Sequence, residues 1–103
     1  MKFGLSIETI NLINTVFLHF PSVKKAIIYG SRAKGNYKHG SDIDLCIVGD
    51  KISSNDVLHV TRELDELPIP YLVDLCILAQ IDNSDLLAHI KRVGKVFYDK
   101  SKV

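Results

Sequence analysis

Three aspartates stand beside strand-forming residues, where their carboxylates could bind a metal ion. Asp42 and Asp44 are separated by one residue at the start of an apolar run that continues to position 48, and Asp74 lies inside a second apolar run over 71–78. Residues i and i+2 of a strand project from the same face, so Asp42 and Asp44 would share a face with their backbones about 6.6 Å apart. Magnesium prefers oxygen ligands and often binds one or two carboxylates plus the phosphates of a substrate. This spacing therefore predicts a divalent metal site.

Asp74 is the third acid of the predicted site. An unpaired carboxylate in the interior of a strand is costly, so its presence there needs a compensating partner. If its strand lies beside the strand of Asp42 and Asp44, the three carboxylates converge. Two divalent ions about 3.5–4 Å apart would then offset their mutual repulsion. We expect Asp42, Asp44 and Asp74 to form one metal-binding and catalytic set.

The segment before the acid pair has the residues of a phosphate-binding turn. Gly30 and Ser31 follow a β-prone run, and a glycine there allows the backbone amides and the serine hydroxyl to approach phosphate oxygens closely. The basic residues that follow would add a positive field, although ordinary solvation of a loop explains them equally well. They are Arg32, Lys34, Lys38 and His39.

The surrounding pattern predicts the elements that position these residues. Serines in capping positions precede three helical patterns, and β-prone runs lie between them. The expected helices begin after Ser6, after Ser53 or Ser54, and after Ser84, and the expected strands cover 23–29, 41–48, 71–78 and 96–98. The order α-β-β-α-β-α-β predicts an α/β (α+β) fold with helices packed on a small mixed sheet. The short connection between the first two strands favours antiparallel pairing.

Composition limits the alternatives. A chain of 103 residues has the size of one domain, so we expect a single domain over 1–103. A net charge of +1 argues against long nucleic acid as the main partner. No apolar run is long enough for a membrane span or placed like a secretion signal, which predicts a cytoplasmic protein without membrane contact. Cys46 and Cys76 each follow a predicted metal ligand by two residues, and we expect them to pack as free thiols beneath the site.

The order of these residues resembles a known signature. Gly30-Ser31, ten residues, and then Asp42-Ile43-Asp44 is similar to the motif of the polymerase-β-like nucleotidyltransferase superfamily. The stretches 30–35 and 41–45 resemble the minimal nucleotidyltransferases, including MntA-type antitoxins, and Asp74 falls where that family has its third acid. The likeness covers roughly residues 23–78.

The resemblance implies specific roles. Asp42 and Asp44 would bind two Mg²⁺ ions, with Mn²⁺ as the other candidate, and Asp74 would bind one ion and act as base for the acceptor hydroxyl. The implied reaction moves a nucleoside monophosphate, AMP from ATP being favoured, onto a hydroxyl with release of pyrophosphate. The nucleotide-binding set would be Gly30, Ser31, Arg32, Lys34 and Ser41.

A chain this short leaves little protein for an acceptor pocket, so a second subunit is expected. The resemblance offers a helical HEPN-domain protein, either as a toxin modified on a tyrosine or as a substrate-binding subunit, and a homodimer is also left open. A non-catalytic antitoxin that binds nucleotide as a regulator is the main alternative. An aminoglycoside-type transferase is a weaker one. A P-loop is excluded because Asn36 and Tyr37 occupy its Lys and Ser/Thr positions. Among the four histidines, His39 draws most attention because it lies in the loop.

Overall fold

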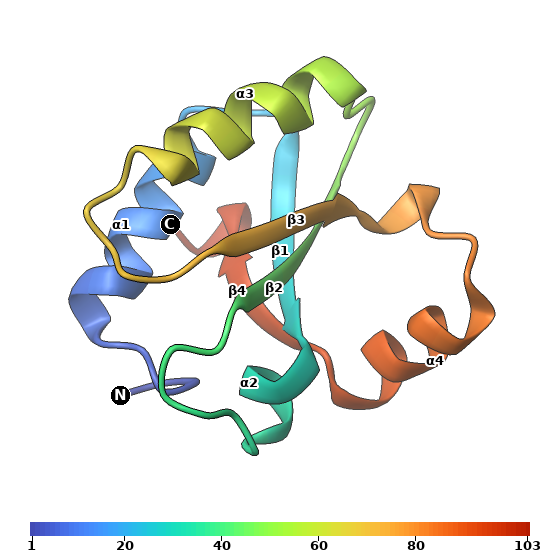
Figure 1. Cartoon of the computed structure of the whole chain (residues 1–103). Coiled ribbons are helices and arrows are strands. Elements are labelled where there is room, and N and C mark those ends of the chain that lie inside the picture. The colour runs from blue at the N-terminus through green and yellow to red at the C-terminus, as the bar shows by residue number, and fades with distance from the viewer.

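A four-stranded sheet in the order β3-β2-β1-β4 forms the centre of the computed structural model, which describes all residues from 1 to 103 (Figure 1). The strands are β1 (Val23–Tyr29), β2 (Ile43–Gly49), β3 (Val73–Ile77) and β4 (Lys95–Asp99). β1 pairs antiparallel with both β2 and β4, whereas β2 and β3 are parallel. The predicted mixed sheet and the antiparallel first pair are confirmed, and the strand of Asp74 does lie beside that of Asp44.

Four α-helices and two 3₁₀ turns complete the fold. The helices are α1 (Ile7–Leu18), α2 (Gly30–Lys34), α3 (Ser54–Asp65) and α4 (Ser84–Val93), and the 3₁₀ turns cover Leu78–Gln80 and Lys100–Lys102. The short helix α2 replaces the simple turn expected after the first strand.

The helix caps follow the sequence with one correction. Ser6 accepts a hydrogen bond from the amide of Thr9 at the start of α1, and Ser53 forms a reciprocal capping box with Asp56 at the start of α3. Ser84 was the expected cap of α4, but the side chain of Asn83 accepts the bond from the amide of Leu86 instead. Both residues are good cap formers, and the helix begins one residue earlier than the choice of Ser84 implies.

The main core lies between one face of the sheet and the helices α1 and α3. Alternate residues of β2 point into it, and Ile43, Leu45 and Ile47 are completely buried there. In Figure 1 these two helices lie close together, whereas α4 stands apart from both. The other face of the sheet therefore has only α4 and the turns around it as cover. No helix of the chain has the length and apolar character needed to cross a membrane.

Candidate active site

Asp44 and Asp74 lie directly opposite each other on neighbouring strands. They are register partners in the parallel β2–β3 ladder, so their side chains project from the same face of the sheet. That face is the one that α1 and α3 leave free, because the alternate residues Leu45 and Leu75 point toward the core. The juxtaposition predicted for these two acids is present.

The surroundings of Asp42 and Asp74 differ from the prediction. Asp42 precedes β2, which begins at Ile43, so it is not a strand residue, and it is exposed. Asp74 was expected to be a buried acid, but its side chain is also exposed. The reason is that β3 is an edge strand of the sheet, where solvent reaches a side chain that would be covered in an interior strand. Only Asp44 is partly buried.

The electrostatics of the site centre on Asp44. Burial raises the pKa of this carboxyl above its ordinary value, and the negative charges of Asp74 and Asp42 raise it further, while His89 lowers it. None of the three carboxylates accepts a hydrogen bond or forms an ion pair within the chain. The site thus holds mutually repelling acids that have no hydrogen-bonded or ion-paired partner in the chain.

A divalent cation suits this donor set. The side chains do not close into a ready group of three metal ligands. Their chemistry nevertheless fits, because all three offer carboxylate oxygens, the ligands that hard divalent cations prefer. Asp42, Asp44 and Asp74 are the residues that would hold such an ion.

Gly30 lies against the carboxylate of Asp44. Its φ is +72°, and a Cβ added at this position would collide with Oδ2 of Asp44. Only glycine meets both demands without strain. The next residue, Ser31, is partly buried, and its hydroxyl has no hydrogen bond within the chain. The turn predicted to bind phosphate therefore adjoins the central carboxylate and has a hydroxyl available.

Arg32 fixes the loop between α2 and β2 with all three nitrogens of its guanidinium group. The side chain is only 3% exposed, and Nε and Nη2 donate to the carbonyl oxygen of Ser41 at 3.0 and 2.8 Å, while Nη1 donates to the carbonyl oxygen of Phe3 at 2.9 Å. The rings of Tyr37 and Tyr71 lie within 5.2 and 4.8 Å of its Cζ. These contacts use the donors that phosphate binding would need, so the geometry gives Arg32 a structural role.

The remaining two members of the expected nucleotide-binding set are Lys34 and Ser41. Lys34 is exposed at the end of α2 and lines a hollow with Arg92 and Lys95. Ser41 uses its hydroxyl to accept a bond from the amide of Lys38 at 2.8 Å. The structure thus brings Gly30 and Ser31 to the carboxylates but leaves Lys34 at the far end of its helix.

The family sequence model described as "Polymerase beta, Nucleotidyltransferase" matches residues 11–103, a span that includes all the residues of this site. The chain belongs to this nucleotidyltransferase family. Among curated relatives, a protein of Methanocaldococcus jannaschii that is provisionally named a protein adenylyltransferase is 37% identical to this chain over 54 residues. The aligned part amounts to 52% of this chain and 38% of the relative.

Three solved structures share the fold of this chain. A toxin–antitoxin complex with AMP-PNP has a TM-score of 0.71 at 19% identity, covering 90% of this chain and 75% of the matched one. A complex of a tri-AMPylated Shewanella oneidensis HEPN toxin with an MNT antitoxin has a TM-score of 0.66 at 16% identity, covering 92% and 73%. A protein of Sulfolobus solfataricus provisionally assigned as a nucleotidyltransferase has a TM-score of 0.59 at 24% identity, covering 96% and 94%. Identities this low establish the fold alone.

His89 is the residue of the candidate site that sequence reasoning missed. Its Nε2 accepts a hydrogen bond from the amide of Gly30 at 3.0 Å, and its ring stands edge-on to Tyr29. His39, which the sequence favoured among the histidines, is exposed and makes no side-chain hydrogen bond.

The two cysteines lie one step further along the same face. Cys46 and Cys76 are register partners, as expected, and both thiols are free. Hydrogen bonding with Cys46 lowers the pKa of Cys76 to about 7, and the Tyr29 hydroxyl, 3.5 Å from its Sγ, acts in the same direction. The same pairing raises the pKa of Cys46. Both cysteines pack against Tyr29 on the sheet face that holds the carboxylates.

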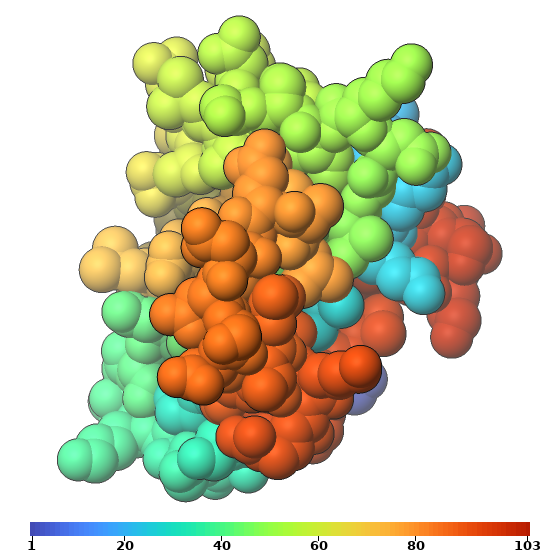
Figure 2. All heavy atoms as spheres, turned by 90° about the vertical axis from the view of Figure 1, so that its right-hand side faces the viewer, coloured from blue at the N-terminus to red at the C-terminus, as the bar shows by residue number.

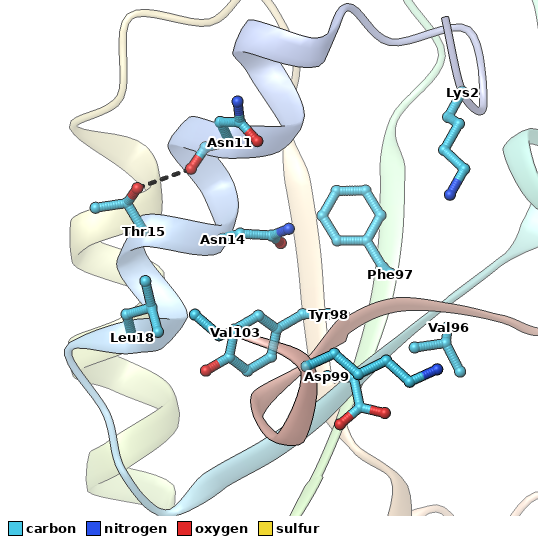
Figure 3. A pocket seen from close by; sticks show the side chains of 11 residues that line it. Lys2, Asn11, Asn14, Thr15, Leu18, Val96, Phe97, Tyr98, Asp99 and Val103 are labelled. Atoms are coloured by element: carbon cyan, nitrogen blue, oxygen red, sulfur yellow. Dashed lines mark hydrogen bonds between the residues drawn. The ribbon is translucent and has the colours of Figure 1, made fainter.

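The carboxylates lie on an open surface and not in a pocket. A hollow of about 570 Å³ lies between α1 and β4 and is lined by Asn11, Asn14 and Thr15 from the helix (Figure 3). It shares no residue with the site, and none of the other hollows contains Asp42, Asp44 or Asp74. An acceptor bound by this chain alone would therefore have few surrounding walls.

Proposed function

We propose that the chain transfers a nucleoside monophosphate, AMP from ATP, to a hydroxyl group of a second protein and releases pyrophosphate. The single observation that carries the proposal is the approach of the Gly30-Ser31 turn to Asp44, itself paired in register with Asp74. Groups suited to phosphate and groups suited to a divalent cation thus adjoin one another. Membership of the nucleotidyltransferase family supports the reaction class.

The residues divide the work between substrate and cation. The hydroxyl of Ser31 would bind phosphate oxygens beside Gly30, whose amide is held by His89, and Asp42, Asp44 and Asp74 would hold Mg²⁺, with Mn²⁺ as the other candidate. When bound, the divalent ion would supply Lewis-acid chemistry, which stabilises charge on the transferring phosphoryl oxygens and eases deprotonation of the attacking hydroxyl. Asp74, exposed at the sheet edge, would take the proton of the acceptor hydroxyl, as the family resemblance implies.

The acceptor is proposed to be a tyrosine of a HEPN-type partner. The open surface around the carboxylates supports a partner that completes the site. The toxin–antitoxin structures that share the fold, one of them with a tri-AMPylated HEPN toxin, support this class of partner.

The test is to incubate the purified chain with ATP labelled on the α-phosphate, MgCl₂ and the protein encoded next to it. Transfer labels the partner and releases pyrophosphate in equal amount. An antitoxin that acts only by binding would bind the partner without labelling it, and EDTA should abolish the labelling if a divalent ion is required.

Asp44→Asn and Asp42→Asn are the decisive variants. Loss of one carboxylate from the set removes several kcal/mol of transition-state stabilisation, so we expect the labelling rate to fall by about 10³-fold. The circular dichroism spectrum should remain that of the wild type, because neither side chain is part of the core. Asp82→Asn, on an exposed loop, is the matched control and should keep full activity. Wild-type rates in either site variant would overturn the assignment.

A further inference from the structure

An apolar groove lies beside α4 on the sheet face that holds the carboxylates. Its volume is about 580 Å³, and its apolar lining consists of Ile27, Leu78, Leu87, Ile90 and Val96. Leu87 is 36% exposed and Val96 is 52% exposed, so the groove presents apolar surface to solvent. Figure 2 faces this side of the molecule and shows α4 in orange in front, with atoms of β1 in cyan beside it. We refer to this feature as the α4 groove.

The α4 groove lies on the same sheet face as the candidate active site. Ile27 shares a sheet face with Tyr29, which is the register partner of Asp44. Ile90 follows His89, the residue that holds the amide of Gly30. Ile27 and Ile90 also pack in the same small cluster as Tyr29 and Cys46. A molecule seated in the groove would therefore be anchored on the same face as the carboxylates.

The rim of the groove is basic. Lys91 and Lys95 line it, and Lys95 also lines the adjoining hollow together with Lys34 and Arg92. No acidic residue lines either hollow, and none of these four cations forms an ion pair. Basic residues in the last turn of a helix favour its dipole, which accounts for Lys91 and Arg92. It accounts for neither Lys95 on β4 nor the exposed apolar floor.

We propose that the α4 groove docks an amphipathic segment of the acceptor protein, with apolar side chains in the groove and acidic side chains against Lys91 and Lys95. The role as an acceptor-docking surface rests on the proposed function. The combination of an apolar floor and a rim of one charge is the complement of such a segment. Docking there would bring the rest of the acceptor over the open carboxylate face.

Other occupants fit this surface less well. Two copies meeting through the same groove would bring their basic rims together, and like charges in an interface repel. Single-stranded nucleic acid uses aromatic side chains for stacking, and none lines the groove. An acidic amphipathic protein segment satisfies both the charge and the apolar surface.

The first test uses a defined peptide as the probe. A fluorescent helical peptide of about 18 residues, with leucines spaced to form one face and glutamates beside them, is titrated with the full chain and followed by anisotropy. We expect saturable binding that weakens with added salt. A peptide with lysine in place of each glutamate should bind at least about tenfold more weakly. Equal binding of the two peptides, or no saturable binding of the acidic one, would overturn the proposal.

Variants locate the binding on the surface. Leu87→Glu should weaken binding of the acidic peptide at least about tenfold, because it places a negative charge in the apolar floor of the groove and repels the peptide. Leu58→Glu changes a similarly exposed leucine on α3 and should leave binding unchanged. Val96→Glu is the second variant should Leu87→Glu unfold. Undiminished binding in a folded groove variant, or an equal loss in Leu58→Glu, would contradict the assignment.

Three further measurements separate the remaining explanations. Sedimentation of the wild type should show a monomer, and a dimer that Leu87→Glu dissociates would identify a second copy as the occupant. Preferential binding of the chain to phosphatidylserine vesicles, lost in Leu87→Glu, would identify a membrane surface instead.

Calorimetric titration with ATP and MgCl₂ is independent of the groove. Failure of the wild type to bind ATP would reject the proposed function while leaving the peptide result standing, and normal ATP binding by Leu87→Glu would show that its defect is confined to docking.

Discussion

The two faces of the central sheet are built for different purposes, although the same strands contribute to both. On β2, Leu45 faces α1 and α3 and is completely buried, while its neighbour Asp44 faces the open side with an unpaired carboxylate. The core-side cluster contains 17 buried residues, and the cluster beneath the site contains three. The stability supplied by the first face allows the second to keep mutually repelling acids that cost stability. A fold of this size can hold such a site because the unfavourable electrostatic free energy is confined to one face of the sheet.

The largest difference between the faces should appear when Leu45 is changed. Leu45→Ala leaves a cavity in a fully buried layer, and we expect the free energy of unfolding to fall by about 3 kcal/mol. Urea denaturation followed by circular dichroism measures it. Leu72→Ala is the control, because Leu72 is 71% exposed and its loss should change stability by less than about 0.5 kcal/mol. Similar losses in both variants would remove the distinction between the faces.

Gly30→Ala tests the contact between the phosphate-binding turn and the acids. The new Cβ is strained by the positive φ and also collides with the carboxylate of Asp44. We therefore expect the free energy of unfolding to fall by about 2 kcal/mol. Gly40 has a φ of +82° but nothing within 4 Å of an added Cβ, which makes Gly40→Ala the control for backbone strain alone. Its cost should be about 1 kcal/mol. Equal costs at the two positions would mean that the approach of Gly30 to Asp44 contributes nothing.

His89→Ala probes the bond that orients this turn. Loss of the acceptor leaves the amide of Gly30 without its partner, and we expect about 1 kcal/mol of destabilisation, with exchange of this amide accelerated about fivefold. Hydrogen exchange followed by NMR reports the amide directly. His89→Gln retains a side-chain acceptor and should restore part of the protection, while His59→Ala, at an exposed site on α3, should have no effect. Unchanged protection in His89→Ala would contradict a positioning role.

The parts of the structure predicted from sequence are those determined by local patterns. Alternation on β2 and β3 indicated which side chains share a face, so the pairing of Asp44 with Asp74 and of Cys46 with Cys76 followed once the strands were placed side by side. The cap at Ser53 and the antiparallel first pair also depend on nearby residues, and they were predicted for that reason.

The features that the sequence did not reveal are contacts between distant parts of the chain. His89 meets Gly30 across 59 positions, and no periodicity in the sequence signals that bond. Arg32 resembled a phosphate ligand, yet its donors are satisfied by Ser41 and by Phe3, which lies 29 positions upstream. Asp74 was expected to be buried because its neighbours are apolar, but exposure depends on β3 being an edge strand. Sheet order is a property of the whole fold, so exposure of one carboxylate could not be inferred from its neighbours.

Asp44→Asn provides the smallest expected effect, and its sign is opposite to that of Leu45→Ala. Burial and the charges of Asp74 and Asp42 raise the pKa of Asp44 in the folded protein above its value in the unfolded chain. The contribution of Asp44 to stability is therefore full below the ordinary pKa and is lost as the pH rises through the raised one. At neutral pH without divalent ions, the asparagine variant should be more stable by about 0.5–1 kcal/mol, after allowance for solvent screening.

The pH dependence separates this electrostatic cause from a change in packing. The advantage of the variant should shrink as the pH falls through the raised pKa, because the wild-type carboxyl then becomes neutral as well. Saturating MgCl₂ should also remove it, since an ion bound to the carboxylates stabilises only the wild type. Thermal unfolding in EDTA and in MgCl₂ at several pH values measures both trends, with Asp82→Asn as the control for loss of one exposed charge. A variant that is less stable at neutral pH in EDTA would show that Asp44 stabilises the fold. The open face of the sheet would then not differ from the core face in the way that we propose.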